Sequence, residues 1–429
     1  MNNITNSKNP LALLFSFLFP FAGLIVSLCH WRKSWAKNVF WLSCVYLGAV
    51  FIFWPEGTTL GEGADGGRYY LKMLEIRSLG LDLGAVLVRH FVDSGGLDMY
   101  FPLIAYLVSQ ITDNGHVLFA VLAFVYGFFY SRNIWYVLDR IPEKKMGWIA
   151  VLVILFFITC PITFINGVRM WTALHIYVYA LMPYLLEKDR SRLWLLLVTP
   201  LVHFSFLIVV AIAFVYILLP SRIKSQNTLF MKISLLFFIA SMFVSSLNLA
   251  SLNSTMKGFS PDAYENKVNV YVSEGRADVY AEAAELHNWY VTASENIQLW
   301  CYNLLIIIMY PLIRKHSMDY QGIMNLYLFV LLLGSAANIM SFVPSGGRFQ
   351  FLATMFKLPL IIWVAMSLTT SSYYLKCVKP AMFLLLIPLV FGIRQMFDFL
   401  SVTAILGNFV SVFFWENNVP LIEYVKQML

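Results

Sequence analysis

Apolar residues in this chain gather in long runs that are separated by short polar segments. Runs of about 20 apolar residues predict helices that cross the hydrocarbon core of a bilayer. The pattern therefore predicts an all-α, polytopic integral membrane protein with about 11–13 transmembrane or re-entrant helices. The expected spans are 10–29, 38–54, 117–138, 148–165, 168–186, 228–248, 297–313, 323–343, 349–368, 380–397 and 402–415.

Two apolar segments do not fit single spans. Residues 99–112 form a short run broken by Pro102, and residues 193–219 are too long for one span and carry Pro200 and His203 in the middle. We interpret both as re-entrant or hairpin elements. Such elements require their bared backbone to be buried in protein or to line a wet cavity.

Composition agrees with this class, because 60% of the residues are hydrophobic and only 12% are charged. We therefore expect residues 1–429 to form one integral membrane domain. The first apolar run has no convincing cleavage site and is interpreted as a retained span. The five cysteines show no CxxC spacing, which favours buried free thiols over a metal or redox site.

Lysines and arginines in the short loops predict the orientation, since such loops favour the cytoplasm. Arg32, Lys33 and Lys37 place the first loop inside, and counting crossings from there puts the other short basic loops on the same side. The long loops 55–97 and 249–295 then fall outside. The net charge of +7 belongs to the cytoplasmic side, where anionic lipid attracts it, and implies no nucleic-acid partner.

The two outer loops differ in character. Loop 55–97 contains an amphipathic segment from about Tyr69 to His90, which is expected to lie along the outer membrane surface as a juxtamembrane helix. Loop 249–295 is the large outer loop and is richer in acidic than in basic residues.

Three arginines follow a Gly-Gly or Gly-Val pair at the edge of an apolar segment: Arg68, Arg169 and Arg348. The predicted topology places all three on the outer face. Arg169 and Arg348 each open an apolar helix, where first-turn amides and the helix dipole add to the guanidinium charge and favour phosphate or diphosphate. The alternative is a structural arginine that pairs with an acidic side chain or a lipid headgroup.

Two titratable residues, Asp65 and His203, are expected on the same face. Asp65 could orient or deprotonate a hydroxyl group, and the pKa of histidine suits proton transfer. Asp65 equally fits a solvated Gly-rich loop, and His203 equally fits a neutral histidine hydrogen-bonded between helices.

Two further candidates have simpler structural interpretations. His175 lies within a span and more often serves packing there. Arg394 lies one helical turn from Asp398, which suggests an internal ion pair near a helix end.

Several motifs are absent from the sequence. There is no P-loop, no H-E-x-x-H, no G-x-S-x-G and no acidic pair suited to a metal-bound nucleotide sugar. We therefore expect no metal and no cofactor. A soluble nucleotide-dependent catalyst is disfavoured, and a lipid-borne substrate is favoured.

These positions resemble the EpsG-like and Wzy-type polymerases of bacterial surface polysaccharide. The resemblance covers residues 60–220 best and rests on Asp65 with Tyr69, the Asn166-to-Arg169 turn that opens a span, and His203-Phe204-Ser205. Where the common family pattern has Arg-Gln, this chain has Arg169-Met170. The C-terminal half matches only in layout, with a large outer loop followed by Arg348.

The resemblance implies a GT-C-like, metal-independent glycosyltransferase in the bacterial cytoplasmic (inner) membrane, with its site facing outward. It would transfer a glycan from undecaprenyl diphosphate to a sugar hydroxyl of another lipid-linked repeat unit. Arg68, Arg169 and Arg348 would hold the diphosphate, and Asp65 or His203 would handle the proton. The implied partners are the polyprenyl-diphosphate-linked oligosaccharide, membrane lipid, and the flippase and chain-length regulator of the same pathway.

Two other functions remain open from the sequence. An O-antigen ligase would perform the same chemistry on a different acceptor. A transporter or flippase of anionic glycolipid would bind substrate through the arginines without making a bond, although no internal repeat supports it. An O-acyltransferase is disfavoured because only His203 is placed to activate a hydroxyl group.

Overall fold

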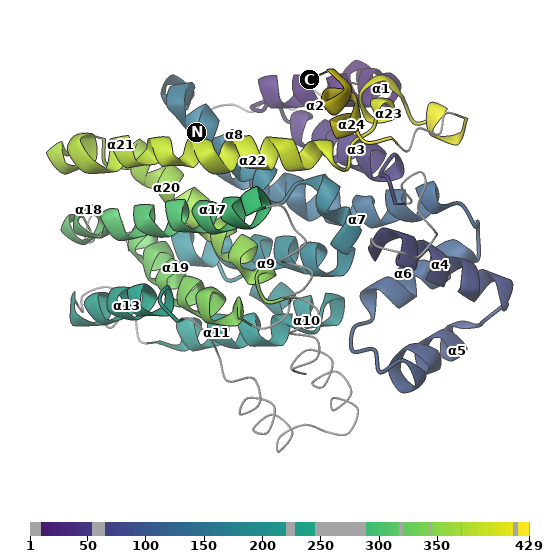
Figure 1. The fold of residues 1–429 in the computed structure, drawn as a ribbon, viewed down its shortest axis with the longest axis horizontal. Coiled ribbons are helices and arrows are strands. Elements are labelled where there is room, and N and C mark those ends of the chain that lie inside the picture. Colours follow the sequence, from purple (N-terminus) through teal and green to yellow (C-terminus); the bar gives the residue numbers. More distant parts are fainter. Residues whose placement is uncertain are drawn as a thin grey trace.

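The structure is a computed structural model that describes residues 10–53, 65–219, 228–244, 289–316, 321–342, 345–369, 371–414 and 419–428. Every regular element within these ranges is a helix (Figure 1). The N-terminal half contains α1 (Pro10–Leu18), α2 (Pro20–Cys29), α3 (Ala36–Ala49), α4 (Asp65–Ser78), α5 (Leu83–Val88), η1 (Arg89–Asp93), α6 (Tyr100–Ser109), α7 (Gly115–Leu138), η2 (Glu143–Lys145), α8 (Met146–Thr159), η3 (Ile162–Gly167), α9 (Val168–Glu187), η4 (Leu193–Leu197), α10 (Thr199–Val202) and α11 (Phe206–Leu218). The C-terminal half contains α13 (Thr228–Ser241), α17 (Trp289–Ile308), α18 (Tyr310–Lys315), α19 (Gln321–Met340), α20 (Arg348–Ser367), η5 (Tyr374–Val378), α21 (Lys379–Ala381), η6 (Met382–Leu385), α22 (Leu386–Phe397), α23 (Val402–Leu406), η7 (Ser411–Phe413) and α24 (Leu421–Met428).

Six helical segments of the described chain are long and apolar enough to cross a membrane. They are Gly115–Leu138, Glu143–Glu187, Asn296–Lys315, Gln321–Met340, Arg348–Ser367 and Tyr374–Phe397. The second segment is divided at Cys160 and Pro161, where the backbone becomes extended before η3 and α9 begin. The expectation of an all-α, polytopic membrane protein is confirmed.

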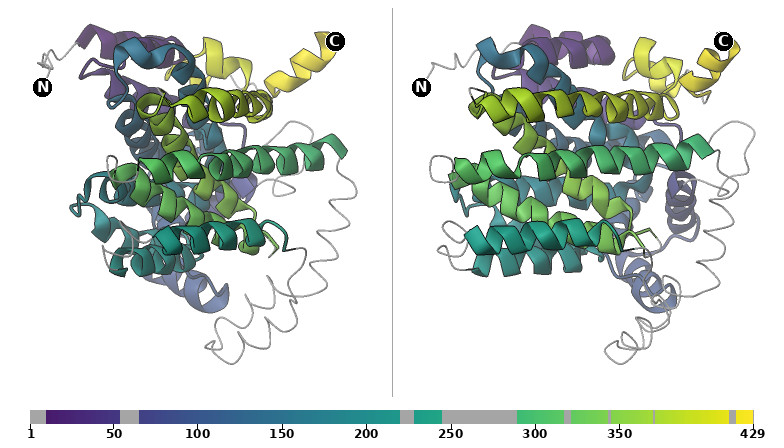
Figure 2. Two further views of the ribbon diagram at one scale, coloured as in Figure 1. Left: turned by 90° about the vertical axis from the view of Figure 1, so that its left-hand side faces the viewer. Right: turned by 60° about the vertical axis from the view of Figure 1, so that its left-hand side comes forward.

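The long helices form a bundle with two distinct ends. In Figures 1 and 2, the axes of helices α11, α17 and α22 are roughly aligned, and α4, α5 and α6 gather at one end of the bundle. Loops predicted to be cytoplasmic meet at the other end. There Arg32 donates a 2.8 Å hydrogen bond to the carbonyl of Ile141, and Lys145 donates a 2.6 Å bond to the carbonyl of Met366.

Two predicted spans are divided into short, separate elements. Residues 10–29 are not one straight helix, because the chain kinks at Phe19, immediately before Pro20, and divides into α1 and α2. Residues 402–415 contain only the short α23 and η7. The backbone is extended at Gly407, and the Asn408 side chain accepts hydrogen bonds from the next turn, so no spanning helix can continue.

The two segments that fit single spans poorly form short elements. Helix α6 has ten residues, which gives roughly 15 Å and about half the thickness of the hydrocarbon core. Residues 193–219 divide at His203. Helices η4 and α10 pack against α9, and the Tyr177 hydroxyl of α9 also donates a 2.8 Å bond to the carbonyl of Val209 in α11. The chain therefore turns back on itself at His203.

Most of the predicted large outer loop, residues 245–288, lies outside the described residues, as does 54–64 of the first outer loop. The described part of loop 55–97 contains α4, α5 and η1. These elements occupy the stretch where the sequence predicts one amphipathic segment from Tyr69 to His90. A left-handed glycine, Gly80, at the end of α4 separates the first two helices.

Candidate functional site

The start of α4 brings three of the predicted site residues together. Asp65 and Arg68 lie one turn apart and form an ion pair. The backbone amide of Gly66 donates a 2.8 Å hydrogen bond to Oδ1 of Asn166, which lies in η3 directly before α9. A side chain at position 66 would press against Asn166 and Phe53, so glycine permits this close approach. The helix that carries Arg68 is therefore anchored beside the helix that carries Arg169.

Arg169 is held by a buried carboxylate that the sequence did not suggest. Its Nη1 donates to both oxygens of Asp98, at 2.9 Å to Oδ2 and 3.3 Å to Oδ1, and its Nε donates to the hydroxyl of Tyr69 at 3.3 Å. The Asp98 side chain is 1% exposed, whereas that of Arg169 is 33% exposed. Nη2 makes no hydrogen bond to a described residue. Two nitrogens of the guanidinium are thus fixed by protein, and Nη2 is available to an anion.

A histidine and a lysine lie on the side of Asp98 that faces away from Arg169 in the line of contacts. Nε2 of His90 lies 3.9 Å from Oδ1 of Asp98, and Nδ1 of His90 lies 3.2 Å from Nζ of Lys72. The His90 ring is buried, and it occupies the space where a side chain at Gly96 would lie. Lys72, His90, Asp98 and Arg169 therefore form a continuous line of polar side chains, which we name the Asp98 cluster.

The mixture of charge and burial shifts two pKa values in the Asp98 cluster. Burial lowers the pKa of Lys72, and the nearby Arg169 lowers it further. Burial also lowers the pKa of His90, and the positive charge of Lys72 acts in the same direction against the opposing effect of Asp98. His90 is therefore neutral at pH 7, because its ordinary pKa is already about 6.5.

We expect the stability of the protein to fall on acidification through His90. A histidine whose pKa is lowered by folding binds a proton more readily in the unfolded state, so the free energy of unfolding decreases as the pH falls through about 6.5. Replacing His90 with Gln should make the decrease in melting temperature between pH 7.5 and 5.5 shallower than in the wild type. His30→Gln, on an exposed histidine near the opposite end, is the control. An unchanged slope in His90→Gln would contradict the assignment.

His203 lies at the chain reversal between α10 and α11. Its Nδ1 is 2.7 Å from Oγ of Ser205, and its ring stacks on Phe204. The backbone links this reversal to the Asp98 cluster, because the amide of Met99 donates a 2.8 Å hydrogen bond to the carbonyl of Leu201. This hydrogen bond joins the residue after Asp98 to a residue two positions before His203, so the two side chains belong to neighbouring segments.

Arg348 opens α20 and is half-buried. Its guanidinium makes no ion pair or hydrogen bond with the described residues. The next residue, Phe349, has its ring centre 6.2 Å from that of Phe206, whose ring lies 6.4 Å from His203. The start of α20 therefore lies beside the reversal that carries His203.

Aromatic side chains also join the starts of α9 and α20. The rings of Phe164, Trp171 and Phe351 contact one another, with centre-to-centre distances of 5.0–5.5 Å. Trp171 lies two residues after Arg169, and Phe351 lies three residues after Arg348. The two helices thus begin next to each other on one packed aromatic layer. Arg68, Arg169 and Arg348, with Asp65 and His203, occupy the same end of the bundle, as the topology predicts.

The two further candidates, His175 and Arg394, are held by other contacts. His175 is fully buried, with Nε2 3.0 Å from the carbonyl of Cys160 and Nδ1 3.2 Å from Nδ2 of Asn133. Its contacts are those of a packing residue. Arg394 forms the expected ion pair with Asp398 at 3.0 Å, with the arginine half exposed. Neither residue contacts the Asp98 cluster in the described structure.

The charged side chains at the end of the bundle that carries the arginines favour the binding of an anion. Four basic side chains, Arg68, Lys72, Arg169 and Arg348, share this region with the carboxylates of Asp65 and Asp98. No group of three or more histidine, cysteine or acidic side chains among the described residues has the arrangement of a metal site. The cluster is suited to hold a phosphate-bearing ligand through guanidinium and ammonium groups.

The sequence reasoning missed Asp98, His90 and Lys72. One local signal was present, because Asp98 follows Gly95-Gly96-Leu97 and lies two residues before the start of the apolar α6. An acidic side chain at the edge of an apolar segment is costly unless it is paired, which is the argument that identified the arginines. Lys72 and His90 lie 18 positions apart in an amphipathic stretch, and no spacing rule connects them.

These features define a class: an all-α, multi-pass membrane protein with a basic cluster at one end of its helix bundle. The chain belongs to the EpsG family, whose family model matches residues 48–414. The resemblance to EpsG-like proteins is thereby confirmed, and membership indicates a membrane protein of the polysaccharide-polymerase type. No curated protein and no solved structure matches the chain.

Proposed function

We propose that the protein is a polysaccharide polymerase that joins lipid-diphosphate-linked repeat units on the outer face of the bacterial cytoplasmic membrane. The observation that carries this proposal is the state of Arg169. Tyr69 and Asp98 bind Nε and Nη1 of its guanidinium, Nη2 has no partner among the described residues, and Arg68 and Arg348 lie at the same end of the bundle. A fixed, partly exposed guanidinium at a helix start suits a diphosphate.

The reaction would replace one glycosidic bond with another. The bond between the donor sugar and the carrier diphosphate breaks, a bond to the acceptor hydroxyl oxygen forms, and the hydroxyl proton leaves. Negative charge develops on the departing diphosphate. Arg169 and Arg348 would stabilise that charge, which is the role of preorganised donors in electrostatic catalysis. The Asp98 carboxylate is almost fully buried and so cannot itself reach a sugar. Its role would be to hold Arg169 in place.

The proton would pass to His203 or Asp65. His203 is partly exposed at the reversal between α10 and α11, beside the start of α20. Asp65 is paired with Arg68, and its carboxylate oxygens can accept a hydrogen bond from a hydroxyl group. Both residues lie at the end of the bundle that carries the arginines. Replacing His203 with Gln and Asp65 with Asn in turn tests which of the two takes the proton, because only the loss of that residue should abolish transfer.

The experiment that tests the function is a reconstituted reaction. Purified protein receives its cognate polyprenyl-diphosphate oligosaccharide repeat, and the products are resolved by gel and mass spectrometry. We expect a ladder spaced by one repeat unit, with release of the lipid diphosphate. Transfer of the glycan to a different acceptor without a ladder would point to a ligase. Unchanged substrate together with protein-dependent movement across liposomes would point to a transporter, and either result would overturn the proposal.

A further inference from the structure

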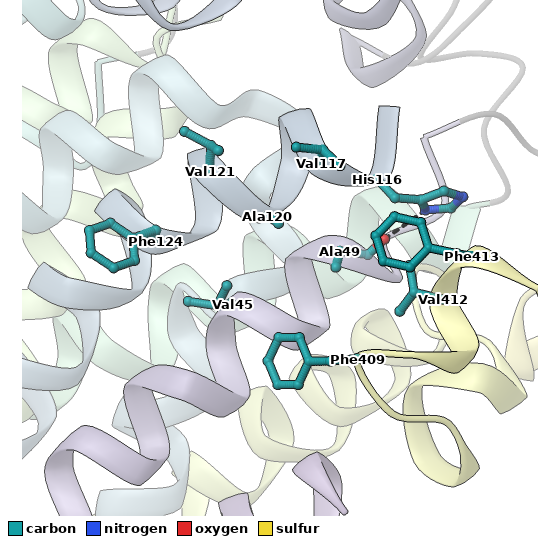
Figure 3. A pocket seen from close by; sticks show the side chains of 10 residues that line it. All are labelled: Val45, Ala49, His116, Val117, Ala120, Val121, Phe124, Phe409, Val412 and Phe413. Carbon is teal, nitrogen blue, oxygen red and sulfur yellow. Dashed lines mark hydrogen bonds between the residues drawn. The ribbon is translucent and has the colours of Figure 1, made fainter. Parts of the chain in front are cut away.

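An apolar groove runs along the outside of the bundle toward the end that carries the arginines. It lies between α3 and α7, is closed on one side by the segment of Phe409 to Phe413, and encloses about 330 Å³ (Figure 3). Its walls come from valine, alanine and phenylalanine side chains, with His116 as the single titratable residue. The volume lies at the lower end of the range for small-ligand sites.

The groove has a direction set by α7. Phe124 lies at one extremity and His116 at the other, eight residues closer to the helix start, which corresponds to roughly 12 Å. Nδ1 of His116 is 2.7 Å from the carbonyl of Ala49, and Asn114 caps the helix start just beyond it. The apolar wall therefore gives way to polar groups at the His116 extremity, as expected where a lipid tail meets its headgroup.

A short chain of contacts leads from His116 to the arginine-bearing end. The His116 ring lies 5.5 Å from that of Phe53, and the Phe53 ring lies 5.1 Å from that of Tyr70 in α4. Phe53 also borders Gly66, whose amide is bound by Asn166. Asp65 and Arg68 flank Gly66 in the chain. A ligand with its tail in the groove could therefore place its headgroup near the start of α4.

We propose that this groove binds the first isoprene units of the polyprenyl chain of the lipid-diphosphate substrate. The proposal rests on the proposed function, because it assumes a diphosphate held near Arg68 and Arg169. A methyl-branched chain fits a wall in which valine methyl groups alternate with the smaller Ala49 and Ala120. The groove is too short for a whole carrier chain, so it selects the units next to the diphosphate.

Photocrosslinking tests the occupant directly. A polyprenyl diphosphate with a diazirine in its second isoprene unit is added to the full-length protein in liposomes, and the labelled peptides are identified. We expect labelling within Val117–Phe124 and near Phe413, which excess polyprenyl diphosphate suppresses and excess phosphatidylglycerol does not. Suppression by phosphatidylglycerol would identify the groove as an ordinary phospholipid site. Labelling only on other helices would also overturn the proposal.

A substitution that fills the groove tests its part in the reaction. Ala120→Phe should raise the KM for a donor with a full-length polyprenyl chain roughly tenfold, because it displaces part of the buried tail. The KM for a donor that carries a methyl group in place of the polyprenyl chain should not change. Ala211→Phe makes the same change on an exposed position of α11 and should affect neither donor. Equal effects on both donors in Ala120→Phe would overturn the proposal.

The two experiments separate this proposal from the proposed function. If the wild-type protein transfers no sugar but still shows the competed labelling on α7, the polymerase proposal fails and the polyprenyl site stands. If the protein makes a ladder but is labelled only outside the groove, and Ala120→Phe leaves the KM unchanged, the polymerase proposal stands and the groove proposal fails.

Discussion

Arg169→Lys is expected to lower the rate of polymer formation on the order of 100-fold, the effect seen when one preorganised donor to a developing negative charge is removed. Lysine keeps the positive charge but loses the planar group that can bind Asp98 and Tyr69 through two of its nitrogens and a diphosphate through the third. The ladder of products in the reconstituted reaction, or polymer length and yield in a complementation assay, measures the change.

The matched control is Arg140→Lys. Arg140 is also ion-paired, with Glu187, but at the opposite end of the bundle. We expect near-normal polymer from this variant. Full polymer length and yield in Arg169→Lys would make the diphosphate role untenable. An equal loss in both variants, accompanied by a fall in the amount of folded protein, would trace the effect to stability.

Asp98→Asn is expected to reduce both stability and activity. The substitution preserves shape but removes the only carboxylate that pairs with Arg169 among the described residues. Breaking a buried ion pair costs about 3–5 kcal/mol, and the partial exposure of Arg169 reduces this to about 2 kcal/mol. Without its partner the guanidinium would no longer be fixed, so transfer should fall by about tenfold or more. Thermal unfolding in detergent and the reconstituted reaction measure the two effects.

A double-mutant cycle shows whether Asp98 acts through Arg169. If it does, adding Asp98→Asn to Arg169→Lys should lower activity little further, because the interaction is already disrupted. Additive losses would mean that Asp98 acts independently. Asp398→Asn, which breaks the exposed pair with Arg394, is the control and should shift the melting temperature little.

The apolar pattern predicted most long helices to within a few residues but not the continuity of every span. Helix α7 begins at Gly115 and ends at Leu138, close to the expected 117–138. The expected span 10–29 proved to be two helices, because Pro20 kinks the chain within the apolar run. Hydrophobicity indicates that the residues are buried but not that the helix is continuous. Hydropathy also could not detect the turn at Gly407 and Asn408, whose cause is backbone conformation.

The site was predicted in part. Charge at the edge of an apolar segment identified Arg68, Arg169 and Arg348 and placed them on one side, and the structure brings them to one end of the bundle. The partner of Arg169 was not predicted, because Asp98 lies 71 positions earlier and no local spacing joins the two. The same holds for Asn166, which was singled out by motif and whose observed contact is the amide of Gly66, 100 positions away.

The sequence by itself determined that this chain is an all-α membrane protein, which family it belongs to, and which end of its helices carries the informative arginines. These properties follow from local hydrophobicity, short motifs and the cost of placing charge at a membrane boundary, all of which act on neighbouring residues. Only the tertiary structure decided that Asp98 fixes Arg169, that His90 and Lys72 stand behind it, and that a groove leads toward them. Pairing and burial depend on which distant segments pack together, and that information is spread over the whole chain.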